Sequence, residues 1–194
     1  MKKLTALIVT LVLLLTLTGC VQGARHPAVM SDGTPWDDSW TGLGERMGVE
    51  QPGGDFTLLV TNGNTRDSKL YYATWIAGKE TVLPDDTLAY ETQLYLMTEP
   101  CILATDAEDT LALWREQLDG DFAVTGERQL TAAGVDYTLV FYDCLAEGSH
   151  YECGVMALGV HNATAITVDL ARTAAYDLDL EALIERFLNG FHFA

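Results

Sequence analysis

The sequence predicts an α+β fold in which an antiparallel β-sheet of about six or seven strands packs with an internal helix and a C-terminal helix. Two segments, residues 105–120 and 177–190, repeat apolar side chains at helical spacing. The other segments between residues 56 and 172 are short, rich in β-branched and aromatic residues, and separated by turn signals. A helix, an antiparallel meander and a final amphipathic helix together form an α+β pattern.

The chain begins with a segment typical of protein export. Lys2 and Lys3 form a short basic start, and an apolar run follows from Leu4 to Thr18. A membrane-spanning helix needs about 20 apolar residues, so this run is short for a permanent anchor. Its length and its small-residue end fit the core of a signal peptide. The four residues LTGC, from Leu17 to Cys20, resemble the lipobox of bacterial lipoproteins.

The lipobox resemblance implies a lipid anchor. In lipoproteins the cysteine sulfur receives a diacylglyceryl group and the preceding peptide is removed, so Cys20 is expected to be lipidated and to become the first mature residue. An ordinary secreted protein with a chance cysteine is the alternative. We expect a signal peptide over residues 1–19, the lipidated cysteine and a flexible tether over residues 20–35, and one globular domain over residues 36–194.

Both predicted helices carry end signals. Thr105 and Glu108 have the spacing of a capping box, and Gly120 stands where the first helix ends. Asp177 or Asp179 caps the second helix. This second helix ends at Asn189–Gly190, and its expected buried face consists of Leu180, Leu183, Ile184, Phe187 and Leu188. A short third helix over residues 40–47 is weakened by three glycines.

The strands are expected in two groups. Before the first helix, residues 56–61 and 69–78 form a hairpin, and residues 87–97 follow as an alternating strand. After that helix, four more strands are predicted over residues 122–132, 135–144, 153–160 and 164–171. Turn signals separate them at Ala133–Gly134, Gly148–Ser149 and His161–Asn162. Both faces of the resulting sheet are apolar enough to be covered, at least in part.

Three cysteines follow the lipobox: Cys101, Cys144 and Cys153. If the hairpin is symmetric about Gly148–Ser149, Cys144 lies directly opposite Cys153. The same register places Tyr137, Leu139 and Phe141 opposite Val160, Leu158 and Met156. Only some directly opposed cysteines have the geometry of a disulfide, so a Cys144–Cys153 disulfide and three reduced thiols both remain open.

The charge of the chain limits its partners. It has 28 acidic and 11 basic residues, a formal net charge of −17. Loss of residues 1–19 would remove Lys2 and Lys3 and no acidic residue, which leaves 9 basic and 28 acidic residues and a charge of −19. Nucleic-acid binding is therefore not expected, because it needs a positive surface.

No motif for catalysis, metal binding or a cofactor is found. The chain has no G-x-S-x-G, H-E-x-x-H or C-x-x-C sequence. Ser149 adjoins His150, but neighbours in a hairpin turn rarely form a nucleophile–base pair. Cys144, His150 and Cys153 form the only candidate metal cluster in the sequence. We prefer structural roles for these three residues over metal binding. We predict no catalytic residue, no metal site, no cofactor and no enzymatic activity.

Aromatic residues gather in two places. Trp36 and Trp40 lie near the tether, and Tyr71, Tyr72 and Trp75 share one predicted strand. If these aromatic side chains are exposed, they could stack on a sugar ring or on a partner protein. Packing in the core is the expectation we prefer, because large aromatic residues are highly buried on average.

Two resemblances concern the whole domain. The order of a helix, antiparallel strands, the strand AITVDLA and the closing helix DLEALIERFLNGFHF resembles the PsbP-like fold, an antiparallel sheet between helices. The segments TPWDDSWTGLG, LYYATWIAG and YETQLYLM are similar to small lipoproteins of gut Firmicutes that have no assigned activity. PsbP-like proteins serve mostly as accessory subunits, so this resemblance implies binding and provides no catalytic residue.

We therefore expect a lipoprotein anchored to the cell membrane through Cys20 and facing outside the cytoplasm. Its expected role is a binding or accessory module of the cell envelope, with membrane lipid and an envelope protein or small ligand as partners. A lipoprotein that binds a sugar, a peptide or a cation is the first alternative. An envelope enzyme is the second.

Overall fold

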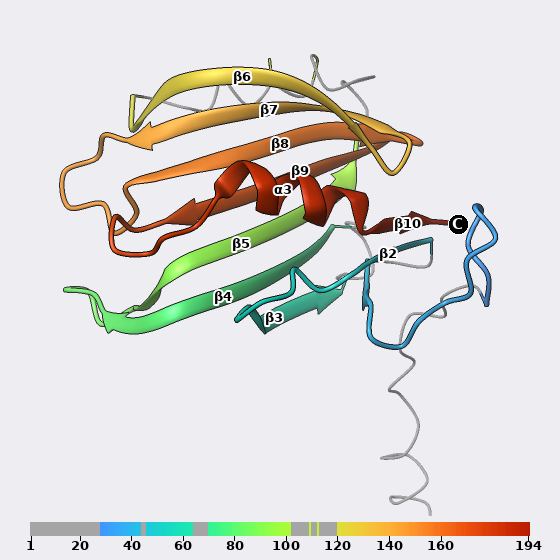
Figure 1. The fold of residues 1–194 in the computed structure, drawn as a ribbon, viewed down its shortest axis with the longest axis horizontal. Helices are drawn as coiled ribbons and strands as arrows, with labels where there is room; N and C mark the ends of the chain where they lie inside the picture. The colour runs from blue at the N-terminus through green and yellow to red at the C-terminus, as the bar shows by residue number, and fades with distance from the viewer. Residues whose placement is uncertain (1–27, 44–45, 64–69, 102–108, 110–111, 113–119) are drawn as a thin grey trace, which may run out of the picture.

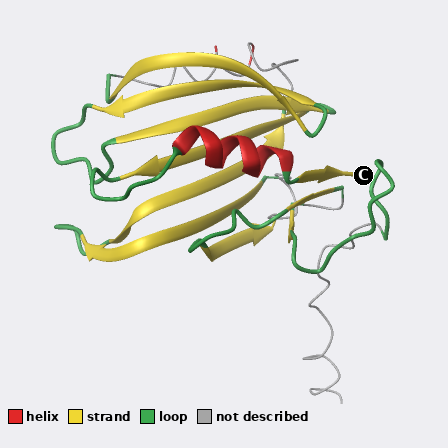
Figure 2. Cartoon of the chain, viewed as in Figure 1, coloured by secondary structure: helices red, strands yellow, loops and turns green. Residues whose placement is uncertain are grey.

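The computed structural model describes residues 28–43, 46–63, 70–101, 109, 112 and 120–194. Within these residues, a large antiparallel sheet carries one helix, α3 (Leu180–Asn189), across one of its faces. A small sheet lies beside the C-terminal end of this helix (Figure 1). Figure 2 shows the same arrangement, with the helix in red in front of the yellow strands. The α+β class predicted from the sequence is confirmed.

The large sheet has seven strands in the described part of the chain. They are β3 (Thr57–Gly63), β4 (Tyr71–Val82), β5 (Leu88–Pro100), β6 (Phe122–Ala132), β7 (Val135–Cys144), β8 (Cys153–His161) and β9 (Thr164–Arg172). Their order is β3-β4-β5-β9-β8-β7-β6. The sheet thus consists of two meanders, β3 to β5 and β6 to β9, which meet where β5 pairs with β9.

Tight turns connect β6 to β7 and β8 to β9. Ala133 and Gly134, between β6 and β7, have φ values of 49° and 76°, and Asn162 and Ala163, between β8 and β9, have φ values of 47° and 58°. Two successive residues with positive φ are the requirement of a type I′ hairpin turn. The turn signals read from the sequence at these two places are confirmed.

The small sheet was not expected. It has the order β1-β2-β10, with β1 at Thr41–Gly42, β2 at Met47–Val49 and β10 at Phe191–Phe193. The short helix considered over residues 40–47, which three glycines weaken, is not found in the residues described there. At Gly48 of β2, a Cβ atom would lie 2.8 Å from the Trp36 ring and 3.1 Å from the Trp40 ring, so both rings pack directly against the main chain of this strand.

The segment before β1 packs onto the domain, which corrects the expected boundary between tether and domain. Val29 and Pro35 form a β-bridge, and Met30 is only 3% exposed. The main-chain N–H and the hydroxyl group of Ser31 both donate to the carbonyl oxygen of Phe193, each at 2.8 Å. Residues 28–35 therefore belong to the domain. Residues 1–27, with the predicted signal peptide and Cys20, lie outside the described residues.

Helix α3 matches its prediction closely. The Asp179 carboxylate accepts a hydrogen bond from the Ala182 N–H at 3.0 Å, which identifies Asp179 as the N-cap. The buried side chains of the helix are Leu183, Ile184, Phe187 and Leu188, and Leu180 is partly buried. The Phe187 ring meets the buried Trp75 ring edge to face, with 5.3 Å between centroids. The helix thus closes the main core against β6, β8 and β9.

The helix predicted over residues 105–120 lies mostly outside the described residues. Asp109 and Ala112 are described and are helical, and Gly120 has a φ of 77°, as expected at a helix end. None of the helices that can be described is long and apolar enough to cross a membrane.

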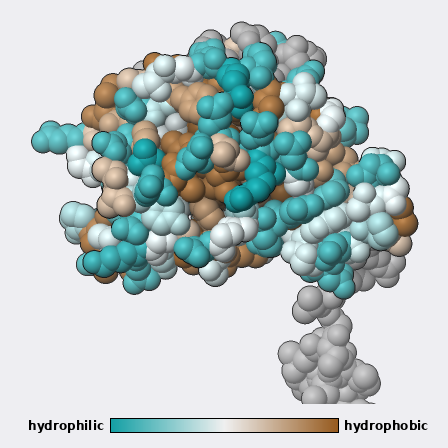
Figure 3. Space-filling model, viewed as in Figure 1, coloured by the Kyte–Doolittle hydropathy of each residue, from teal (hydrophilic) through white to brown (hydrophobic). Residues whose placement is uncertain are grey.

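The other face of the sheet, here called the distal face, carries a second apolar cluster. Its members are Val140, Tyr142, Met156 and Leu158, each between 0% and 9% exposed. The opposite face, which carries α3, presents apolar groups between hydrophilic ones around the helix (Figure 3). Apolar side chains are therefore buried on both faces of the sheet, as the sequence pattern predicts.

Two tyrosines of β7 lie over glycines of β8, one on each face of the sheet. Tyr137 pairs with Gly159, and Tyr142 pairs with Gly154. A Cβ atom at Gly159 would come within 2.6 Å of the Tyr137 ring, and one at Gly154 would clash with the Tyr142 ring. Each ring therefore occupies the space that a side chain on β8 would fill.

Candidate functional site

The most unusual polar group in the described sheet is the carboxyl group of Asp169. Asp169 lies in β9, near the centre of the sheet, and its register partners are Tyr95 of β5 and Met156 of β8. Thr74 of β4 and Val140 of β7 extend this row on the distal face. Asp169 is half-buried there. A carboxyl group is thus held among aromatic and apolar side chains.

Tyr142 fixes the position of this carboxyl group. Its hydroxyl group donates a hydrogen bond of 2.6 Å to Oδ1 of Asp169. Tyr142 and Asp169 are separated by β8, and the tyrosine ring crosses that strand above Gly154. The Phe122 ring packs edge to face on Tyr142, with 5.0 Å between centroids. The glycine of β8 therefore makes this hydrogen bond geometrically accessible.

The surroundings of Asp169 disfavour its charged form. Burial raises the pKa of the Asp169 carboxyl group to about 6, although the hydrogen bond from Tyr142 lowers it. Burial, and then the nearby Asp169 charge, also raise the pKa of Tyr142 above its usual range. No lysine or arginine in the described residues forms an ion pair with Asp169. A carboxyl group whose pKa is raised this far is a candidate for a functional site, because perturbed pKa values cluster at such sites.

Further tyrosines lie near this carboxyl group. Burial, followed by the Asp169 charge, raises the pKa of Tyr151 to about 12. The Tyr151 hydroxyl group donates to the Gln93 amide oxygen at 3.2 Å. On the neighbouring strands, the Tyr72 and Tyr95 rings lie 6.3 Å apart. Tyr95 is the register partner of Asp169, and Tyr95 and Tyr151 are both half-buried, so these two tyrosines form an aromatic rim beside the carboxyl group.

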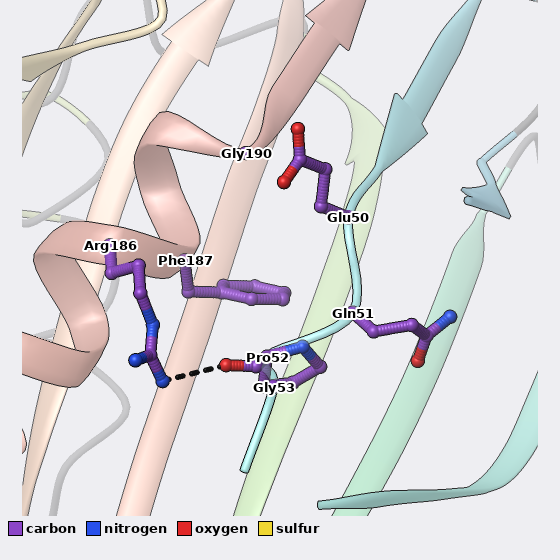
Figure 4. A pocket seen from close by; sticks show the side chains of 7 residues that line it. All are labelled: Glu50, Gln51, Pro52, Gly53, Arg186, Phe187 and Gly190. Atoms are coloured by element: carbon purple, nitrogen blue, oxygen red, sulfur yellow. Dashed lines mark hydrogen bonds between the residues drawn. The ribbon is translucent and has the colours of Figure 1, made fainter. Parts of the chain in front are cut away.

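A cavity of about 200 Å³ lies elsewhere, at the C-terminal end of α3 (Figure 4). Its lining residues are Glu50, Gln51, Pro52, Gly53, Arg186, Phe187 and Gly190. Arg186 donates to the Pro52 carbonyl oxygen at 2.7 Å, and the Glu50 carboxylate points away from Arg186. Gln51 accepts a hydrogen bond of 2.6 Å from the Trp75 indole. These contacts hold the segment after β2 against α3, so we interpret the residues around the cavity as structural.

His192 holds the two ends of the described chain together. Its ring stacks on Trp40 with centroids 3.8 Å apart, and its Nε2 lies 3.1 Å from Glu50. Its Nδ1 lies 3.7 Å from Asp32. The two carboxylates approach opposite nitrogens of one ring, so they do not converge on a common point where a metal ion could sit.

The structure corrects the register predicted for Cys144 and Cys153. Cys153 is paired with Asp143, and the main-chain N–H of Cys144 donates to the carbonyl oxygen of Glu152 at 2.8 Å. A shift of one residue sends the two cysteine side chains to opposite faces of the sheet. The same shift places Tyr137, Leu139 and Phe141 opposite Gly159, Ala157 and Val155, not the predicted partners. Cys144 and Cys153 are both free thiols in the structure.

The other residues singled out from the sequence do not meet at one site. Ser149 donates to the carbonyl oxygen of Tyr151, and His150 contacts the carbonyl oxygen of Tyr90, so they are not a nucleophile–base pair. The residues described contain no cluster of three or more potential metal-ligating side chains. Trp75 is fully buried, as preferred for the core, whereas Trp36, Trp40, Tyr71 and Tyr72 are half-buried.

Reasoning from the sequence missed Asp169. The segment TAITVDLA has the pattern of a strand and contains one acidic residue, Asp169. An acid inside an otherwise apolar strand was the available signal, because an aspartate is rarely buried unless it is paired. Its tyrosine partner comes from another strand and could not be identified without the register.

Comparisons with known proteins add little beyond the fold. No family model matches the chain, and no curated protein matches its sequence. The chain is similar to the solution structure of the cyanobacterial PsbP protein, CyanoP, from Synechocystis, with 14% identity and a TM-score of 0.41. This match covers 73% of the present chain and 95% of the cyanobacterial chain. CyanoP belongs to the family that the order of elements resembles, but a likeness of this size carries no argument about function.

Proposed function

We propose that this protein is a lipoprotein anchored through Cys20 and facing outside the cytoplasm, where it acts as a binding module of the cell envelope. The lipobox at residues 17–20 carries this proposal. The packed domain begins at Ala28, eight residues after Cys20. Eight residues span at most about 28 Å, so the domain would stay close to the membrane surface.

Lipid labelling in cells tests the anchor. Cells that express the full chain or its Cys20→Ser variant are grown with a labelled fatty acid, and the purified protein is examined for label. We expect label on the native chain and none on the variant, because the thioether requires the Cys20 sulfur. Cys101→Ser is the matched control and should keep the label. Equal labelling of the native chain and Cys20→Ser would show that the anchor assignment is wrong.

Binding of a small ligand is the form of this role that we favour over a purely accessory role. The supporting observation is the half-buried Asp169 carboxyl group, with its aromatic rim and without a basic partner in the described residues. A group of this kind lowers stability unless something compensates its charge. We propose no catalytic role for it.

A further inference from the structure

We propose that Asp169 and the surrounding tyrosines form a binding site for a small organic cation, such as a quaternary ammonium group. This inference deepens the binding role proposed above and gives it a ligand class. It does not depend on the lipid anchor.

The first support is the arrangement of the side chains. Tyr95 lies beside Asp169 in the register of the sheet, and Tyr142 orients the carboxylate through its 2.6 Å hydrogen bond. Tyr151 lies close enough for the Asp169 charge to affect its hydroxyl group. Aromatic rings attract an alkylammonium ion through their electron-rich faces, and such cages recognise choline-like groups. A carboxylate within the cage supplies the counter-charge.

The second support is charge complementarity. The chain has a net charge of −17, so the field of the whole molecule attracts cations. The arginines of the large sheet, Arg172 on the same strand as Asp169 and Arg128 on β6, are engaged elsewhere. Arg128 forms ion pairs with Glu181 and Glu185 of α3, and Arg172 donates to main-chain carbonyl groups. A cationic ligand would supply the partner that Asp169 lacks in the described chain.

The third support is the composition of the row, which favours an organic cation over a metal ion. A calcium ion takes six to eight oxygen ligands, and magnesium takes six. The row contains one carboxylate between Tyr95 and Met156, with Val140 beyond. Apolar and aromatic neighbours suit the methyl groups of a quaternary ammonium ion better than the hydration shell of a metal.

The test compares two ligands that differ only in charge. The full chain, purified in detergent, is titrated calorimetrically with choline and with its neutral isostere 3,3-dimethylbutan-1-ol. We expect choline to bind at least tenfold more tightly than the alcohol. Asp169→Asn keeps an oxygen that can accept from Tyr142 and should weaken choline binding at least tenfold. Asp136→Asn is the control. It removes the same charge from an exposed position near the start of β7 and should leave choline binding unchanged.

A second variant separates loss of the site from loss of the fold. Tyr95→Phe retains an aromatic ring and should bind choline as the native chain does, whereas Tyr95→Leu should bind it more weakly. Four outcomes would overturn the proposal. The first two are the absence of choline binding and equal affinity for choline and the alcohol. The third is an equal loss of choline affinity in Asp136→Asn and Asp169→Asn. The fourth is binding of Ca²⁺ that is tighter than that of choline and is lost in Asp169→Asn. The result is independent of fatty-acid labelling, so failure here would leave the anchor proposal standing.

Discussion

At the scale of single residues, the Asp169 carboxyl group lowers the stability of the fold and is also the group on which the binding proposal depends. Its pKa of about 6 lies above the ordinary value of 3.8 because the carboxyl group is desolvated. Between these two values the folded chain binds more protons than the unfolded chain. The free energy of unfolding therefore falls as the pH rises from about 4 to about 6, and this contribution is constant above pH 6.

Asp169→Asn should consequently stabilise the protein at pH 7.5. The neutral amide avoids burial of a charge and can still accept the Tyr142 hydrogen bond. A shift of about two pKa units sets the gain at roughly 1–3 kcal/mol, and the gain should disappear at pH 4. Urea unfolding of both proteins across this range measures it. Asp32, Asp37 and Asp85, whose pKa values are lowered by hydrogen bonds, are present in both proteins and cancel in the difference. A difference independent of pH would contradict the assignment.

Gly154 is the second residue with a specific consequence. A Cβ atom here would clash with the Tyr142 ring and lie 2.8 Å from the Leu170 carbonyl oxygen, and neither the ring nor the main chain can move away easily. Gly154→Ala should therefore destabilise the protein by about 1–3 kcal/mol. Gly126→Ala is the matched control, because its Cβ atom would meet only the Phe141 ring, at 3.9 Å. Thermal unfolding of both variants measures the contrast, and equal midpoints would contradict this explanation.

At the scale of elements, the β7–β8 hairpin shows where sequence reasoning reaches its limit. Its strands were placed correctly, but their register was wrong by one residue. Register is usually selected by the alternation of apolar and polar residues. Six consecutive residues of β8, Gly154–Gly159, are buried, so alternation gives no preference. The glycines under Tyr137 and Tyr142 favour the observed register, and their role is visible only once strands are paired.

This register leads to a prediction about the cysteines. Cys144 and Cys153 point to opposite faces of the sheet, so we expect both to be reduced. Burial raises the pKa of both thiols, which should slow their alkylation in the folded protein. Alkylation in denaturant without reductant, followed by peptide mass spectrometry, should find both cysteines modified. A peptide cross-linked through Cys144 and Cys153 would refute the register argument.

At the scale of the whole molecule, the sequence predicted the α+β class, the seven strands and the closing helix with its cap at one of two aspartates. These features depend on local patterns and end signals. The small sheet and the packing of residues 28–35 depend on contacts between distant parts of the chain. Thr41 and Val49 are near each other in sequence, but Phe191, which also pairs with Val49, comes after all seven strands of the large sheet. No local signal encodes such a contact.

The bonds between Ser31 and Phe193 also define how the molecule would respond to mechanical force. Any pull on the chain ahead of Ala28 would load the hydrogen bond between Ala28 and Trp36 and the β-bridge between Val29 and Pro35, and then the two hydrogen bonds that Ser31 donates to Phe193. Phe193 is the last residue of β10, which follows α3, and it pairs with Met47 of β2. The small sheet would therefore take up the strain before the seven-stranded sheet does. Asp169 and its tyrosines, which lie on the distal face of the large sheet, would be the part of the protein best shielded from such tension.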